Sequence, residues 1–166
     1  MTTHRLFLAG LVTATIGNAL VAGVFFAFSS FVMPALARIT PASGVSAMQS
    51  INIVVVPSLF LKTFALTTLL SALLVFTPAF RGTGLTSWLC SVAGLVSVAG
   101  SFGVTMWLNV PLNDALAAVT PGTQDAAALW TDYLRNWGTA NLARMLASTI
   151  ASALFLGAAL RVAAES

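Results

Sequence analysis

Four long apolar stretches constrain the fold of this chain more than any other feature. They cover residues 6–33, 52–76, 87–108 and 141–162. A helix needs about 20 apolar residues to cross a hydrocarbon core of ~30 Å, and each stretch reaches that length. The sequence therefore predicts four transmembrane helices, the first ending at Pro34 and the second at Pro78.

The scarcity of charge supports this interpretation. Only 7% of the 166 residues are charged and 58% are hydrophobic, whereas roughly a quarter of the residues of a soluble domain are charged. The net charge of +3 comes from scattered basic residues that form no patch, which argues against a nucleic-acid partner. We expect one integral membrane domain over residues 1–166, with the lipid bilayer as its partner.

The few cysteine and histidine residues exclude several kinds of site. Cys90 is single and lies in an apolar stretch, so no internal disulfide forms and the side chain is expected to pack in the core. One His and one Cys supply no zinc or haem motif, and we predict no metal site and no cofactor. The first stretch is too long for a cleaved signal peptide, whose apolar region is normally 7–15 residues.

Four spans place both termini on one side of the membrane. The short connection, 77–86, lies on that side, and the long connections, 34–51 and 109–140, lie on the other. Basic residues on the two sides are Arg5, Arg81 and Arg161 against Arg38 and Arg135. This margin favours termini in the cytoplasm.

The fold expected is an all-α, four-helix transmembrane bundle with an amphipathic helix between the third and fourth spans. Small residues at four-residue spacing in three of the spans favour close helix packing. Thr123 can cap the amphipathic helix, which we expect to end at Gly138. Its apolar face, which carries Trp130, Tyr133 and Trp137, predicts a helix parallel to the membrane, at the headgroup boundary or over the mouth of the bundle.

Polar residues inside the spans need an explanation because they are costly in lipid. Asn18 is expected to form an interhelical hydrogen bond. Lys62 and Arg144 can extend their long side chains to the headgroups, which is easier for Arg144 near a helix end than for Lys62.

Amides and a carboxylate cluster where the third stretch ends, in the sequence "NVPLND". Pro111 is expected to end this helix, so Asn109 and Asn113 can either satisfy freed backbone groups or line a polar pocket. Polar residues from all four spans converge on this side: Arg38, Gln49, Asn52, Asn109, Asn113, Asp114, Asn141 and Arg144. We predict that Arg144 points into the bundle mouth and contacts the Asn109–Asn113 turn or Asp114, not the lipid headgroups.

The segments "AGVFFAFSSFVMPAL", "MQSIN" and "NVPLN", followed by Trp137, Asn141 and Arg144, resemble the anthrone-oxygenase-like family. The resemblance extends from about residue 9 to 159. It implies a four-helix protein of the bacterial inner membrane. A few fungal members are associated with the oxidation of an anthrone to an anthraquinone by molecular oxygen, without metal or flavin.

This resemblance implies an oxygenase that acts on a lipophilic aromatic substrate, anthrone- or quinol-like. Such an enzyme needs a base and a group that stabilises an anion. The catalytic candidates are Asp114 as the base and Arg144, helped by Asn109 and Asn113, as the stabilising group. A solvated loop carboxylate is the alternative for Asp114. The substrate-binding candidates are Arg38, Gln49, Asn52, Asn109, Asn113, Trp137 and Asn141.

Two other functions stay open. The chain could be a non-enzymatic partner that stabilises another membrane complex, or a small transporter subunit. No internal repeat is visible, which disfavours the transporter. The sequence also leaves open a homo-oligomer.

Overall fold

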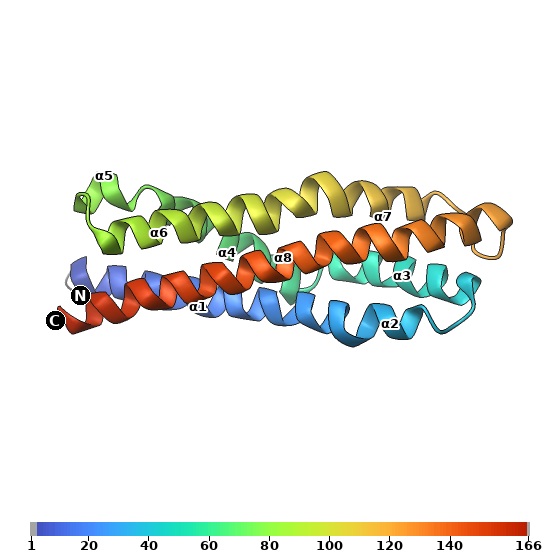
Figure 1. The fold of residues 1–166 in the computed structure, drawn as a ribbon, viewed down its shortest axis with the longest axis horizontal. Coiled ribbons are helices and arrows are strands. Elements are labelled where there is room, and N and C mark those ends of the chain that lie inside the picture. Colours follow the sequence, from blue (N-terminus) through green and yellow to red (C-terminus); the bar gives the residue numbers. More distant parts are fainter. Residues whose placement is uncertain (1–2, 166) are drawn as a thin grey trace.

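The computed structural model describes residues 3–165, and these residues form an elongated bundle of four antiparallel helical runs (Figure 1). The first run consists of α1 (Thr3–Ala27), η1 (Phe28–Val32) and α2 (Met33–Leu36). The second consists of α3 (Pro41–Val55) and α4 (Leu59–Val75), and the short α5 (Thr77–Arg81) follows it. The third consists of α6 (Leu85–Leu95), η2 (Val96–Gly103), η3 (Thr105–Asn109) and α7 (Val110–Ala117). The fourth is the single helix α8 (Gln124–Ala164).

The ends of the runs confirm the expected up-down order. Both termini and the α5–α6 connection lie at one end of the bundle in Figure 1, and the α2–α3 and α7–α8 connections lie at the other. Three of the runs are long and apolar enough to span a membrane: Thr3–Leu36, Leu85–Ala117 and Gln124–Ala164. The second run qualifies only when α3 and α4 are counted as one span bent by 59°. The chain is therefore an all-helical protein with three to four membrane-spanning helices.

The bend in the second run was not predicted. It falls at residues 56–58, where Pro57 supplies no N–H. Ser58 begins the new helix, since its Oγ accepts the N–H of Leu61 at 3.2 Å and donates to the carbonyl of Val55 at 2.6 Å. The backbone at the break is thus satisfied locally, and α4 starts in a new direction.

Prolines in the first and third runs do not end the helices, contrary to prediction. Pro34 lies in α2, and Pro111 lies in α7, which continues to Ala117. Each proline follows a π-helical stretch: the N–H of Met33 bonds to the carbonyl of Phe28, and that of Val110 to the carbonyl of Thr105. A π-helical turn contains about one residue more than an α-helical turn. This extra residue lets the helix continue through a proline that would otherwise break it.

The predicted amphipathic helix exists, but it is not a separate element parallel to the membrane. Thr123 caps it as expected, because its side chain accepts the N–H of Ala126. Gly138 does not end it, and α8 runs unbroken for 41 residues. A glycine inside a helix costs about 1 kcal/mol, which burial of Trp130, Tyr133 and Trp137 outweighs. These aromatic side chains lie in the bundle core rather than at a headgroup boundary.

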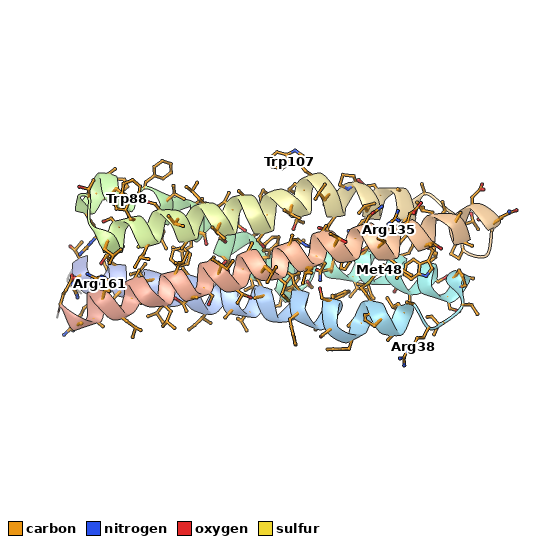
Figure 2. All side chains as sticks on the ribbon, in the orientation of Figure 1. Arg38, Met48, Trp88, Trp107, Arg135 and Arg161 are labelled. Atoms are coloured by element: carbon orange, nitrogen blue, oxygen red, sulfur yellow. The ribbon has the colours of Figure 1, made fainter. Side chains whose placement is uncertain are left out.

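Two tryptophans indicate how the bundle sits in a membrane. Trp88 and Trp107 of the third run are 58% and 79% exposed, and Trp107 points away from the bundle in Figure 2. Their separation of 19 residues corresponds to about 28 Å of helix, close to the ~30 Å between the aromatic belts of a bilayer. At about 60 Å, α8 is twice that length. With these two tryptophans at the membrane boundaries, the end of the bundle with the long connections would extend beyond the hydrocarbon core.

Within the span, polar and small residues hold the runs together. Asn18 donates to Ser71 at 3.3 Å and accepts from Ser97 at 2.8 Å, which confirms the interhelical hydrogen bond. Cys90 is fully buried in the apolar core, as expected. Lys62 is exposed on the outer surface of α4, in keeping with a side chain that extends to the headgroups.

Candidate functional site

A cavity of about 480 Å³ lies beside the bend between α3 and α4. Helices of all four runs contribute to it, and its volume is typical of a small-molecule site. Most of its wall is apolar and includes Phe25, Phe28, Met48, Phe60 and Trp137. The polar residues that line it are Gln49, Asn52, Thr105, Asn113, Asp114, Asn141 and Arg144.

Arg144 is buried at this cavity, with 5% of its surface exposed. Nη1 donates to Oγ1 of Thr105 at 3.2 Å, and Nη2 donates to Oδ1 of Asn141 at 2.7 Å. The guanidinium carbon lies 4.3 Å from the centre of the Phe25 ring and 5.1 Å from a ring of Trp137. Two aromatic faces and two neutral oxygens thus hold the cation.

No carboxylate among residues 3–165 pairs with Arg144. A buried charge normally requires a partner, because its removal from water costs several kcal/mol. A guanidinium has five N–H donors; Thr105 and Asn141 take two, and Nε has no protein partner. The cavity wall therefore carries a positive charge that an anionic oxygen of a ligand could neutralise.

Asn141 fixes the position of the guanidinium. Its Nδ2 donates to the carbonyl of Phe25 at 2.8 Å and to Oγ of Ser29 at 2.7 Å, which leaves Oδ1 for Arg144. Ser29 lies in the π-helical stretch η1. The irregular turn in the first run and the fully buried amide on α8 therefore orient Arg144 together.

The other end of the cavity contains amides and a carboxylate. Gln49 joins α3 to the end of α7, since Nε2 donates to the carbonyls of Leu116 at 2.8 Å and Val119 at 3.0 Å. Asn113 accepts the hydroxyl of Tyr133 at 2.8 Å, and Asn52 interacts with the same hydroxyl. Asp114 is exposed, yet it lines the cavity. It therefore lies at the mouth.

Arg144 and Asp114 lie at different depths. Thr105, which bonds to Arg144, precedes Asp114 by nine residues in one helical run. That spacing corresponds to at most about 13 Å along the axis. A cation at the inner end, a carboxylate at the mouth and aromatic walls between them suit a flat ligand whose two reactive positions lie on opposite sides of its ring system.

The structure brings together most, but not all, of the residues proposed from the sequence. Arg38 is exposed and points away from the bundle (Figure 2), so its assignment to the site was wrong. Asn109 is buried, with Nδ2 3.4 Å from the carbonyl of Trp137, and it is not among the residues of the cavity wall. Both residues lie at the expected end of the bundle, but their side chains do not line the cavity.

The expected partners of Arg144 were also wrong. It faces inward as predicted, but it bonds to Thr105 and Asn141 rather than to segment 107–114. The reason is that the third run continues past Pro111, so no broken end supplies free carbonyls. Phe25 and Thr105, which line the cavity and contact Arg144, were missed as site residues. Of these residues, only Thr105 could have been found from the sequence, because it lies one helical turn before Asn109.

Among the described residues, no group of three His, Cys, Asp or Glu side chains is arranged as metal ligands would be.

Comparison with known proteins identifies the family. No curated protein and no solved structure matches the chain. The sequence profile described as anthrone oxygenase matches residues 54–154, which include the bend, α4, the whole third run and most of α8. The match covers more than half of the chain and includes Thr105, Asn113, Asp114, Asn141 and Arg144. The chain belongs to the anthrone oxygenase family.

Proposed function

We propose that this membrane protein is a cofactor-free oxygenase that oxidises a lipophilic aromatic ketone of the anthrone type, or a related quinol, with molecular oxygen. One observation carries the proposal: Arg144 is buried without a carboxylate partner in a cavity with aromatic walls. The family match supports the same reaction class.

The first step is removal of a proton from the substrate. In an anthrone, the acidic CH2 group and the carbonyl lie opposite each other across the central ring. Asp114 at the mouth accepts the proton from this carbon, and the electron pair moves through the ring to the carbonyl oxygen. Arg144 then stabilises the resulting enolate oxygen with its spare N–H groups and its charge.

The second step consumes oxygen. The enolate donates an electron to dioxygen, and the resulting radical and superoxide combine to form a C–O bond and a peroxide. Loss of the second hydrogen from the same carbon, with cleavage of the O–O bond, gives the new carbonyl and one water. The balance is one CH2 group and one O2 converted to one C=O group and one H2O, with no external reductant.

The apolar wall supports this chemistry. It excludes water around the enolate, which strengthens the interaction with Arg144. Phe25 and Trp137 lie against the guanidinium and also line the cavity, so a substrate oxygen beside Arg144 is surrounded by aromatic side chains.

The test uses purified full-length protein in lipid nanodiscs with an anthrone and dissolved oxygen. We expect the quinone absorbance to appear with consumption of one O2 per quinone, and the quinone oxygen to derive from ¹⁸O2. An Arg135→Gln variant is the control for substitution of Arg144 and should keep the activity. Arg135 is an exposed arginine of α8 that pairs with Asp132 at 3.1 Å.

Quinone formation no faster than in empty nanodiscs would contradict the proposal. In that case, co-purification of a second polypeptide in stable stoichiometry would favour the alternative, a stabilising partner of another membrane complex.

A further inference from the structure

We infer that the cavity opens sideways into the bilayer at the bend between α3 and α4, so that its ligand arrives from the lipid rather than from water. We call residues 53–60 the elbow. The inference rests on the proposed function for the identity of the ligand, but not for the position of the opening.

Several residues of the elbow belong both to the cavity wall and to the outer surface. Ile53 and Val56 line the cavity and are 72% and 64% exposed. Phe60 lines it from the first turn of α4 and is half-buried. A wall whose residues are this exposed is thin, and the apolar side chains that form it can be in contact with acyl chains on one side and ligand on the other.

Aromatic and polar contacts place the elbow at the edge of the hydrocarbon core. The rings of Phe60 and Phe25 lie 5.9 Å apart, and Phe25 lies 4.3 Å from the guanidinium of Arg144. Arg144 bonds to Thr105, two residues before Trp107. These contacts connect Phe60 to the part of the third run that carries Trp107, the tryptophan that we place at the membrane boundary.

The outer surface around the elbow is apolar. Val54 and Leu59 are 65% and 79% exposed and lie on either side of the bend. Farther along α4, Leu66, Leu69 and Leu73 continue the exposed apolar surface. A surface of this composition fits acyl chains and not water.

Hydrogen bonds of Ser58 stabilise the elbow, so it is not a frayed helix end. Ser58 uses both its backbone N–H, 3.1 Å from the carbonyl of Val55, and its hydroxyl to satisfy the break. Irregular backbone is tolerated at membrane depth only where its polar groups are satisfied. The bend therefore lies beside the cavity with part of its backbone satisfied by Ser58.

A flat aromatic ligand dissolved in the bilayer could then enter between the elbow and α1, with its oxygen directed at Arg144. Asp114, which is exposed and lines the same cavity from α7, can exchange protons with water.

The first experiment measures the position of the opening without any ligand. Spin labels are attached to Ile53→Cys and Val56→Cys in a Cys90→Ser background in nanodiscs. Their collision rates with lipid-soluble oxygen and a water-soluble nickel complex are compared with two controls. The controls are Leu66→Cys on the exposed face of α4 and Ser46→Cys on the exposed face of α3.

We expect both elbow labels to resemble the label at residue 66, with high oxygen and low nickel accessibility. Labels at both positions that resemble residue 46 would overturn the inference, because the opening would then face water.

The second experiment blocks the opening. Val56→Trp is compared with Leu66→Trp, a substitution of similar exposure away from the cavity. The probe is a hydroxyanthraquinone, which cannot be oxidised further at the ring, delivered from vesicles in a stopped-flow instrument. Rates of binding and of release should both fall by about tenfold in Val56→Trp relative to Leu66→Trp.

Unchanged rates in Val56→Trp would contradict this route. A probe that does not bind to the wild-type protein would count against the proposed function, while the spin-label result would still decide where the cavity opens.

Discussion

Nη2 of Arg144 donates a 2.7 Å hydrogen bond to Oδ1 of Asn141, three residues earlier on the same face of α8. Asn141 is itself fixed by the carbonyl of Phe25 and the hydroxyl of Ser29. The cation is therefore held in place by groups that position it without neutralising it. Such an arrangement costs stability in the empty protein and is useful only when an anion binds or forms beside it.

Arg144→Met is expected to separate function from stability. Activity should fall at least about 100-fold, because the main stabilising group for the enolate is lost. The thermal midpoint should stay equal or rise, because an unpaired buried charge is replaced by an apolar side chain of similar length. Oxygen consumption and thermal unfolding in nanodiscs measure the two effects. A large drop in the midpoint would indicate that Arg144 is mainly structural.

Asp114→Asn is expected to lower turnover by about 10²–10⁴-fold with little change in binding, since general bases contribute rate enhancements of that size. The side chain is exposed at the cavity mouth, so the fold should not depend on its charge. Asp132→Asn, an exposed carboxylate outside the cavity wall, is the matched control. Full turnover in Asp114→Asn would mean that another group or water accepts the proton.

Gly94→Ala should destabilise the bundle by about 1–3 kcal/mol through overpacking. A Cβ at this position would collide with the backbone carbonyl of Ser71 and lie 2.7 Å from a methyl of Val75. A backbone group cannot rotate aside, so α4 and α6 must separate. Gly157→Ala on α8 meets nothing within 4 Å and should be neutral or slightly stabilising. Equal unfolding midpoints for the two variants would contradict this packing.

Asn18→Ala should cost about 1–2 kcal/mol, because it removes the hydrogen bonds to Ser71 and Ser97, and bonds between membrane helices average about 0.6 kcal/mol each. Thr149→Ala is the control, since its hydroxyl bonds only within α8 to the carbonyl of Met145 on an exposed face. Reversible unfolding in mixed micelles measures both. Similar losses in the two variants would show that the buried network contributes little.

The sequence predicted the number and order of the helical runs because apolar length determines them directly. It also identified the inner cation, Arg144, and its partner Asn141, because polar groups in an apolar stretch are rare and must face the interior. Helix ends were predicted less well. The sequence predicts helix ends at Pro34 and Pro111, but the helices continue through both prolines after π-helical turns, and nothing in the local sequence signals such a turn.

The aromatic face of residues 130–137 shows a second limit. Its periodicity predicted an amphipathic helix, but periodicity cannot distinguish a headgroup boundary from a protein core that extends beyond the membrane. Tertiary contacts decided the outcome: Gly44 on α3 leaves room for the ring of Trp130, which a Cβ at residue 44 would meet at 2.6 Å. Arg38 was misplaced for a related reason, since a membrane side does not specify the direction of a side chain.

The ionisation of a bound hydroxyanthraquinone tests directly whether Arg144 stabilises an anionic oxygen in the cavity. Its phenolate absorbs at longer wavelength than the neutral phenol, so a titration in nanodiscs reports the charge of the ligand in the cavity. If Arg144 holds an anionic oxygen, the dye bound to the wild-type protein should ionise about 1–3 pH units below the dye in lipid alone, and this difference should disappear in Arg144→Met. Identical titration midpoints for the dye bound to wild type and to Arg144→Met would contradict the central claim.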